Sequence, residues 1–315
     1  MRLQNQVDIW QFKKVFILYN RYSGRQLFAS MMSRINEVYK LLKQELDADI
    51  ELLDVQYFEQ MPELAQKAAD EKCDWVIIAG GDGTIRAFAE DMLRLNYRPY
   101  ISVFPAGTVN LIAKEASLRN EPERWVRRAL KGSVYPFYTA RANGNLFLTV
   151  ASVGFDSLVV DNVGALQKRL LNKLAYVLQS TQLVRRELVF SNWRYAFKVR
   201  FDDEKEWYTG SSVIVGKSRY YAGRYNLFPD ADLSLPYLHV AVFPGNKRAE
   251  ILKYASLIAL ESLGMDRDIL CRKAKKVSIE SVSLVDDFPV ELDGDVVAST
   301  PLTLEIMDEP LWFIP

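Results

Sequence analysis

The sequence predicts an α/β protein of two domains: a doubly wound domain with a parallel sheet, followed by a second, mainly antiparallel β domain that is sandwich-like. The chain has 315 residues, which is ample for two cores of ordinary size. From about Lys14 to Leu130, short apolar runs alternate with segments of helical periodicity, and beyond about Tyr135 strand-like segments dominate. We place the domains at residues 10–134 and 135–315, with the last residues free to pack back on the first domain.

The first domain consists of repeated strand–helix units. Its expected strands are short and apolar and lie at residues 15–19, 49–55, 75–80 and 100–105. Helical segments follow at 25–46, 61–71 and 84–95, and a further helix is expected to begin near Asn110. This alternation predicts a parallel sheet covered by helices. Turns after such strands lie at the carboxyl edge of the sheet, where sheets of this kind bind ligands.

The second domain is expected to consist mainly of antiparallel strands. Strand-like segments lie at residues 145–155, 194–201, 206–216, 238–244, 275–284 and 289–298. Two helical segments interrupt them, at 162–182 and 248–264. A succession of strand-like segments of this kind favours a sandwich.

Composition narrows the classes of function. Lys plus Arg and Asp plus Glu number 40 each, so the formal net charge is zero and the basic excess typical of nucleic-acid-binding proteins is missing. Cys73 and Cys271 lie far apart in the sequence and predict free thiols in a reducing compartment. The sequence shows no secretory signal pattern and no uncharged apolar run of about 18 residues. We therefore expect a cytoplasmic protein that has no nucleic-acid partner and meets membranes only peripherally.

The stretch AGGDGT, residues 79–84, carries the strongest functional signal. It follows an apolar strand and precedes a helical segment. Glycines let a ligand approach the backbone, and the N-terminus of a helix favours an anion, so phosphate is the natural ligand. A carboxylate beside a phosphate repels it unless a metal ion lies between them, which indicates magnesium at Asp82. Thr84 can cap the helix or donate its hydroxyl to a phosphate oxygen. By itself, GGDG is also consistent with a tight turn whose aspartate is solvated.

Two other turns strengthen the phosphate hypothesis. FPAGTVN, residues 104–110, also ends an apolar strand in a Gly-Thr turn before a helix. NRYSG, residues 20–24, follows the first strand. Three turns rich in small residues at one edge of one sheet are difficult to explain as independent accidents.

The motifs resemble those of the diacylglycerol kinase catalytic family, which includes bacterial lipid kinases, sphingosine kinases and ceramide kinases. The first-half motifs that carry the resemblance, in the family's order and spacing, are NRYSG, GGDGT and PAGTVN. In the second half, ASVGFD (151–156) resembles the family's glycine-phenylalanine-aspartate segment and LQKRLLNKLAY (166–176) resembles the helix after it. ELDGD (291–295) resembles the aspartate-glycine-acid motif. The similarity spans nearly the whole chain, and GGDGT is its most specific part.

The resemblance implies a lipid kinase that binds ATP at the turns of the first domain and receives a lipid hydroxyl from the β-rich domain. The residues implied to bind the nucleotide are Asn20, Ser23, Gly24, Gly80, Gly81, Gly83, Thr84, Gly107, Thr108 and Asn110. Asp82 would act through Mg²⁺, which Asp295 would help to hold, and Asp293 would be the general base for the acceptor hydroxyl. Phosphoryl transfer depends on charge neutralisation and a positioned acceptor, which agrees with this assignment. Taken alone, DGD favours an ordinary β-turn.

The chain also departs from the family pattern. Many members have Asn-Asp after the second Gly-Thr, whereas Leu111 follows Asn110 here, and the usual proline of the first motif is Arg21. The usual glutamate after aspartate-glycine is Asp295, and many bacterial members have an aspartate near Tyr138. Fewer acidic groups are therefore present to hold magnesium.

The segment 162–182 has leucines at every fourth position with basic residues nearby. A helix packed against the core is one interpretation, and a basic border to the lipid entrance that contacts anionic headgroups is the other.

Three further functions stay in view. A protein of the same fold that binds lipid or nucleotide but has lost catalysis is consistent with Leu111 and Tyr138, while Asp82 and Asp293 oppose it. An NAD kinase shares the GGDGT turn but needs a PTGSTAY-like stretch that this chain lacks, and a phosphofructokinase-like sugar kinase needs an acidic TIDND-like motif that is also missing. The sequence does not select the lipid, and a homodimer is compatible with it.

Overall fold

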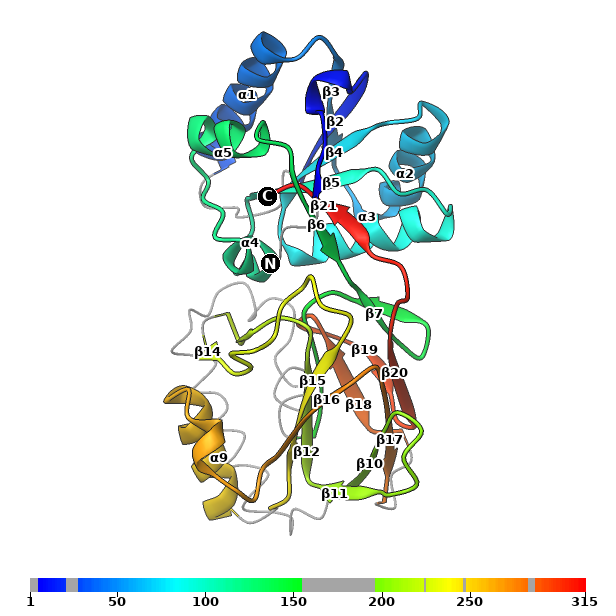
Figure 1. Ribbon diagram of the computed structural model, residues 1–315, viewed down its shortest axis with the longest axis vertical. Coiled ribbons are helices and arrows are strands. Elements are labelled where there is room, and N and C mark those ends of the chain that lie inside the picture. The colour runs from blue at the N-terminus through cyan, green and yellow to red at the C-terminus, as the bar shows by residue number, and fades with distance from the viewer. Residues whose placement is uncertain (1–4, 21–27, 155–195, 224, 246–247, 283–286) are drawn as a thin grey trace. The chain divides into compact units, whose positions relative to one another are not determined.

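The computed structural model describes residues 5–20, 28–154, 196–223, 225–245, 248–282 and 287–315, which form two compact units (Figure 1). The first unit lies within residues 1–139, 232–235 and 308–315, and the second within 140–231 and 236–307. The division therefore falls after Thr139, whereas the sequence placed it near Val134.

The first unit contains a seven-stranded sheet in the order β1-β6-β21-β5-β4-β2-β3. Its parallel strands are β2 (Lys14–Asn20), β3 (Asp49–Val55), β4 (Trp75–Gly80), β5 (Tyr100–Pro105) and β21 (Leu311–Phe313). An antiparallel edge adds β6 (Ser133–Phe137) and β1 (Asn5–Gln6). The predicted parallel sheet is confirmed, and the C-terminal strand β21 is inserted between β5 and β6.

Helices cover both faces of this sheet. In Figure 1, α1 (Phe28–Glu45) and α5 (Pro122–Ala129) lie on one face, and α2 (Met61–Asp70) and α3 (Asp82–Arg94) lie on the other. All six residues of β4 are buried, as expected for a strand covered on both sides. The short helix α4 (Leu111–Glu115) follows β5. The strand–helix alternation thus produces the doubly wound arrangement that it predicted.

The second unit is built from two six-stranded sheets whose strand pairs are all antiparallel. The first sheet has the order β11 (Tyr208–Gly210), β10 (Phe197–Phe201), β17 (Lys276–Ser281), β20 (Leu302–Ile306), β7 (Ala140–Ala142), β8 (Asn145–Phe147). The second has the order β16 (Leu270–Ala274), β15 (Leu238–Phe243), β12 (Ser212–Gly216), β9 (Val150–Val153), β18 (Pro289–Leu292), β19 (Asp295–Ser299). A separate two-stranded sheet pairs β13 (Tyr220–Tyr221) with β14 (Tyr225–Asn226).

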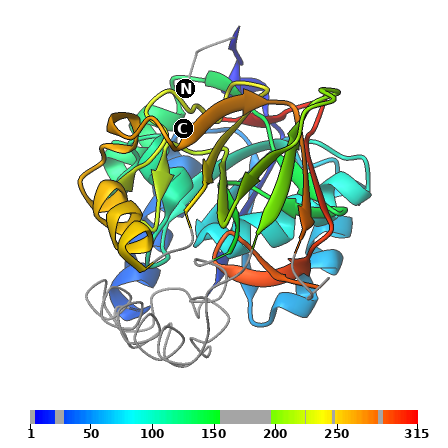
Figure 2. The same ribbon diagram turned by 90° about the horizontal axis from the view of Figure 1, so that it is seen from below.

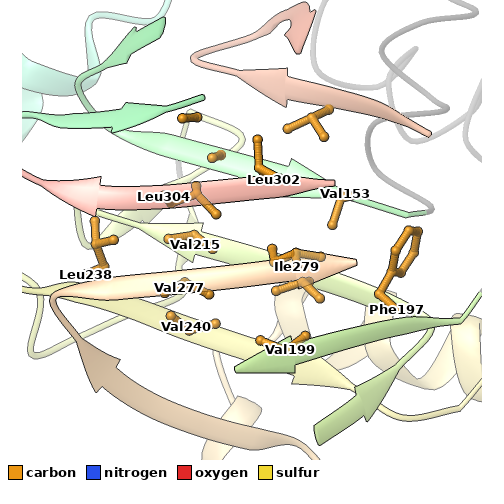
Figure 3. Packing of buried hydrophobic residues seen from close by; sticks show 14 of the residues in the cluster. Val153, Phe197, Val199, Val215, Leu238, Val240, Val277, Ile279, Leu302 and Leu304 are labelled. Atoms are coloured by element: carbon orange, nitrogen blue, oxygen red, sulfur yellow. The ribbon is translucent and has the colours of Figure 1, made fainter. Parts of the chain in front are cut away.

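The core of the second unit lies between the two large sheets. Figure 3 shows Val199, Val277 and Leu304 of the first sheet packing with Val215 and Val240 of the second. The intervening residues of the second sheet point the other way, where they form another buried cluster with Tyr254 of α9 (Arg248–Ala259), the gold helix in Figure 2. This is the packing of a β-sandwich with one outer face covered by a helix.

Three expected strands differ from the structure. Segment 145–155 divides into β8 and β9, which belong to different sheets. Segment 206–216 divides at Ser211 into β11 and β12, which belong to different sheets. Segment 289–298 is a hairpin of β18 and β19. In all three segments, periodicity cannot show where a strand ends and the chain turns or enters another sheet. The helical segment 162–182 lies outside the described residues. Among the helices that the structure does describe, none is both long enough and apolar enough to span a membrane.

His239 is a buried polar residue at one end of the second sheet. It is paired with Gly216 of β12 and Lys273 of β16, and its ring lies 5.9 Å from that of Phe228. Burial lowers the pKa of this imidazole to about 4, and the positive charges of Lys273 and Lys217 act in the same direction, against Asp230. The folded protein therefore holds His239 neutral at pH 7.

We predict that this histidine makes the second unit sensitive to mild acid. The unfolded chain binds a proton on His239 near pH 6.5, whereas the folded chain binds it only near pH 4. The contribution is therefore complete above pH 6.5 and is lost as the pH falls from 6.5 to 4, by at most about 3 kcal/mol. Urea unfolding at pH 7.5 and 5.0 should show a smaller loss of stability for His239→Leu than for the wild type. Equal losses would contradict this assignment.

Candidate functional site

The candidate site is the carboxyl edge of the sheet in the first unit. There β2 ends at Asn20, β4 ends at Gly80 and β5 ends at Pro105. Because β4 pairs with both β2 and β5, the ends of these three strands are neighbours in space. Ser23 and Gly24, predicted for the first turn, lie outside the described residues. The other predicted residues of the first unit meet at this edge.

The turns after β4 and β5 touch through two glycines. A Cβ atom on Gly107 would lie 2.5 Å from the Cα of Gly81 and 2.7 Å from Oδ1 of Asn110, so no side chain fits there. Asn110 locks this turn, since its Oδ1 accepts from the N–H of Gly107 at 2.9 Å and its Nδ2 donates to the carbonyl of Gly107 at 2.7 Å. Asn110 is left-handed, with φ of 53°, a conformation that asparagine tolerates. Gly107 is therefore needed for the contact between the two turns, in addition to any contact with a ligand.

Asp82 joins the two turns. The N–H of Leu111 donates to its Oδ2 at 2.8 Å, and the N–H of Ile112 donates to its Oδ1 at 3.1 Å. These are amides of the first turn of α4, which have no carbonyl partner within that helix. A carboxylate here satisfies them and complements the positive end of the helix. The position of Asp82 among three glycines thus has a structural reason in addition to any contact with a ligand.

A side-chain hydrogen bond connects β2 to the same assembly. Nδ2 of Asn20 donates to Oγ1 of Thr84 at 3.1 Å, and Thr84 is only 3% exposed. A Cβ atom on Gly80 would lie 2.8 Å from the Cβ of Thr84, so this glycine lets the threonine pack under the turn. Thr84 therefore supports the turn from inside rather than standing at its surface.

The accessible part of the edge is the start of α3. A Cβ atom on Gly83 would meet no atom of the described chain within 4 Å, in contrast to Gly107. In this first turn the N–H groups of Thr84 and Ile85 donate to the carbonyl of Gly81 at 3.0 and 3.2 Å. The helix is 13 residues long, so its N-terminus carries a partial positive charge. Thr108 on the neighbouring turn is exposed. Space, backbone donors and an exposed hydroxyl together suit an anion such as phosphate.

Magnesium is the ion that the family resemblance implies. Among the residues that the structure describes, no three His, Cys, Asp or Glu side chains gather in a way that could hold a metal ion. Asp295 begins β19 in the second unit, whereas Asp82 is in the first. Mg²⁺ is usually held by one or two carboxylates together with water and substrate phosphates. Asp82 therefore fits as one contributor beside phosphates rather than as part of a protein cage.

Asp293 lies in the turn between β18 and β19. Asp293 and Gly294 both have positive φ, 51° and 96°, as in the tight hairpin turn that Asp-Gly favours. The turn predicted for DGD is thus confirmed. The Asp293 carboxylate accepts hydrogen bonds from three successive amides, Leu148 at 2.8 Å, Thr149 at 2.8 Å and Val150 at 3.2 Å, and from the Thr149 hydroxyl at 2.6 Å.

The sequence offered no signal for several partners of these carboxylates. Leu148 and Thr149 lie 145 and 144 positions from Asp293, and Leu111 lies 29 positions from Asp82. Glu291 is buried and accepts a hydrogen bond from Oγ of Ser152 at 2.9 Å and another from the N–H of Gly294. Backbone donors carry no residue signature, so only the folded chain reveals them.

Comparisons with known proteins find matches to both halves of the chain. Residues 14–142 match the model of the diacylglycerol kinase catalytic domain, and residues 149–314 match that of the YegS C-terminal NAD kinase beta sandwich-like domain. A Bacillus subtilis (strain 168) protein named diacylglycerol kinase is 23% identical, covering 92% of each chain. A diacylglycerol kinase of Staphylococcus carnosus (strain TM300) is 24% identical, covering 92% of this chain and 90% of its own. A solved structure from Bacillus anthracis strain Sterne shares the fold with a TM-score of 0.79 at 23% identity, covering 99% of this chain and 98% of that one.

We predict opposite effects of two glycine substitutions on stability. Gly107→Ala should lower the free energy of unfolding by about 1–3 kcal/mol, because its methyl group overlaps the Gly81 backbone. Gly83→Ala should leave it unchanged or raise it by up to about 1 kcal/mol, since its methyl group enters open space on a helix. Urea unfolding of both variants checks this, and a Gly107→Ala protein as stable as Gly83→Ala would contradict the contact between the turns.

Proposed function

The chain combines a diacylglycerol kinase catalytic domain, residues 14–142, with a YegS C-terminal NAD kinase beta sandwich-like domain, residues 149–314. From this premise we propose that it transfers the γ-phosphoryl group of ATP to the hydroxyl of a lipid. The acceptor class is diacylglycerol, a sphingoid base or ceramide. The observation that carries the proposal is the pair of touching glycine turns at the N-terminus of α3, with open space over Gly83.

In this proposal the first unit binds the phosphates of ATP. The N–H of Gly83 at the start of α3 donates to a phosphate oxygen, and the exposed Thr108 hydroxyl adds a side-chain donor. Asn20, Thr84 and Asn110 hold the turns in shape through the hydrogen bonds described above. Gly80, Gly81 and Gly107 permit the close packing that brings the turns together. Ser23 and Gly24 are proposed to complete the nucleotide site.

Asp293 of the second unit is proposed to act on the lipid. The acceptor oxygen forms a bond to the γ-phosphorus while the bond from that phosphorus to the ADP oxygen breaks. The hydroxyl proton passes to the Asp293 carboxylate, so the products are ADP and the phosphorylated lipid. Magnesium, when bound with ATP, would neutralise phosphate charge beside Asp82, with Asp295 as a further candidate ligand. The weak basicity of a carboxylate suits a transfer that depends mainly on positioning.

A lipid substrate places the protein at a membrane surface. We propose a cytoplasmic protein that associates with membranes peripherally while it acts on lipid. The match to a diacylglycerol kinase catalytic domain, whose name implies a lipid substrate, supports this proposal.

A second candidate function is a binding protein of the same fold that has lost catalysis. Leu111, at the position where many family members have an aspartate, is a buried residue that opens α4, and Tyr138 donates its N–H to the carbonyl of Leu233 at 3.0 Å. Neither side chain can coordinate a cation as a carboxylate does. An NAD kinase is the weaker alternative, because the PTGSTAY-like stretch of that family is missing from this chain.

Transfer of labelled γ-phosphate from ATP tests the proposal. Wild-type protein with magnesium should label one of diacylglycerol, monoacylglycerol, sphingosine or ceramide presented in mixed micelles. Asp293→Asn should reduce the turnover number at least about 100-fold without changing the affinity for ATP. Label on NAD alone would identify an NAD kinase, and ATP binding without transfer to any acceptor would identify the non-catalytic alternative.

We also predict that Gly83→Ala separates nucleotide binding from folding. Its methyl group would occupy the space in which a phosphate meets the start of α3. Affinity for ATP, measured by calorimetry, should fall about tenfold or more, since a displaced phosphate loses charge-assisted hydrogen bonds worth about 1.5–3 kcal/mol each. Unchanged affinity in a folded variant would place the phosphates elsewhere.

A further inference from the structure

One edge of the second sheet in the second unit gathers three chain segments around Thr149. Strand β9 is antiparallel to both β12 and β18 and lies between them. The start of β9 at Val150 therefore meets the end of β12 at Gly216 and the end of β18 at Leu292. Thr149 directly precedes β9 and is completely buried at this edge.

Thr149 is held from both sides. Its carbonyl accepts hydrogen bonds from the N–H of Lys217 at 2.7 Å and from the N–H of Ser218 at 3.1 Å, just beyond β12. Its N–H and hydroxyl both donate to Oδ1 of Asp293, at 2.8 and 2.6 Å, just beyond β18. Thr149 thus connects a rigid backbone segment to the carboxylate that the proposed reaction uses.

The hydrogen bonds are distributed unequally over the two carboxylate oxygens. Oδ1 of Asp293 accepts from the Thr149 N–H, the Thr149 hydroxyl and the Val150 N–H, whereas Oδ2 accepts from the Leu148 N–H. Each carboxylate oxygen offers about two acceptor directions. The described donors therefore saturate Oδ1, and Oδ2 is the oxygen with capacity for a further proton donor.

The turn is tied to β9 through its backbone, since the N–H of Asp293 donates to the carbonyl of Val150 at 2.9 Å. Asp293 is in a left-handed conformation between two strands, outside the ladder of the hairpin. The hydrogen bond from the Thr149 hydroxyl is the shortest of those described for the Asp293 carboxylate. Unlike the bonds from the amides, it depends on the identity of a side chain. A threonine at this position is therefore the part of the arrangement that a single substitution can remove.

We propose that Thr149 is a positioning residue that fixes the Asp293 carboxylate by binding Oδ1, so that Oδ2 receives the proton of the acceptor hydroxyl. This inference rests on the proposed lipid kinase function. General-base catalysis depends on placement, and small displacements of a reacting group reduce rates by about 100-fold. The residue acts through Asp293 and makes no contact with the reacting atoms.

Thr149→Val tests the inference because valine has the same shape, keeps the N–H donor and lacks the hydroxyl. We expect its turnover number to fall about 10- to 100-fold, with KM for ATP and for the lipid changed by less than about twofold. Thr149→Ser, which keeps the hydroxyl, should recover most of the loss. A turnover number for Thr149→Val equal to that of the wild type would overturn the proposal.

Ser211→Ala is the matched control for the loss of a buried hydroxyl in the same unit. Ser211 is buried and its hydroxyl donates to the carbonyls of Phe243 and Gly245, away from Asp293. If Ser211→Ala lowers turnover as much as Thr149→Val at similar thermal stability, the effect is structural and the proposal is wrong. If wild type and Asp293→Asn turn over equally, the assignment of Asp293 fails instead.

A measurement independent of turnover keeps the two proposals distinguishable. Hydrogen exchange measured by mass spectrometry reports how well the amides of residues 148–150 are protected. These amides donate hydrogen bonds to the Asp293 carboxylate. In Thr149→Val these amides should exchange up to about tenfold faster, while protection elsewhere in the second unit is unchanged. Unchanged exchange at these positions would show that the hydroxyl does not fix the carboxylate, whatever the enzyme's activity.

Discussion

Two hydrogen bonds between the Asp82 carboxylate and the start of α4 connect the turns of the candidate site in the first unit. Asp82 lies on the turn after β4, and its carboxylate accepts hydrogen bonds from the first two N–H groups of α4, the helix that follows β5. The same two turns also meet at Gly81 and Gly107, where a side chain on Gly107 would overlap the Gly81 backbone. The open N-terminus of α3, where we place the phosphates of ATP, is therefore a consequence of how two adjacent strands end.

The second unit contains a similar interaction between an aspartate carboxylate and backbone amides. Asp293 also lies in a glycine-containing turn, and its carboxylate also accepts backbone amides of a segment distant in sequence. A carboxylate is suited to this task because it accepts several hydrogen bonds and backbone donors near strand and helix ends need partners. In each unit, an aspartate that the sequence predicts to act in catalysis also binds backbone amides of a distant segment.

Much of the fold could be predicted because its signals are local. Apolar runs and helical periodicity located β2, β3, β4 and β5 and the helices between them, and Gly-rich turns located the edge of the sheet. The separation of β11 from β12 and the insertion of β21 beside β5 depend on pairings between residues distant in sequence, which no local pattern encodes. The same limit applies to the site: residue types pointed to Asp82 and Asp293, but their backbone partners at Leu111 and Leu148 carry no signature in the sequence.

The most direct test of the central claim, that the touching turns form a phosphate site, is a crystal structure of the protein with ADP and magnesium. The account predicts phosphate oxygens within hydrogen-bonding distance of backbone N–H groups in the first turn of α3, over Gly83, with the bonds between Asp82 and α4 intact. A nucleotide bound elsewhere on the first unit, with that turn left to solvent, would contradict it.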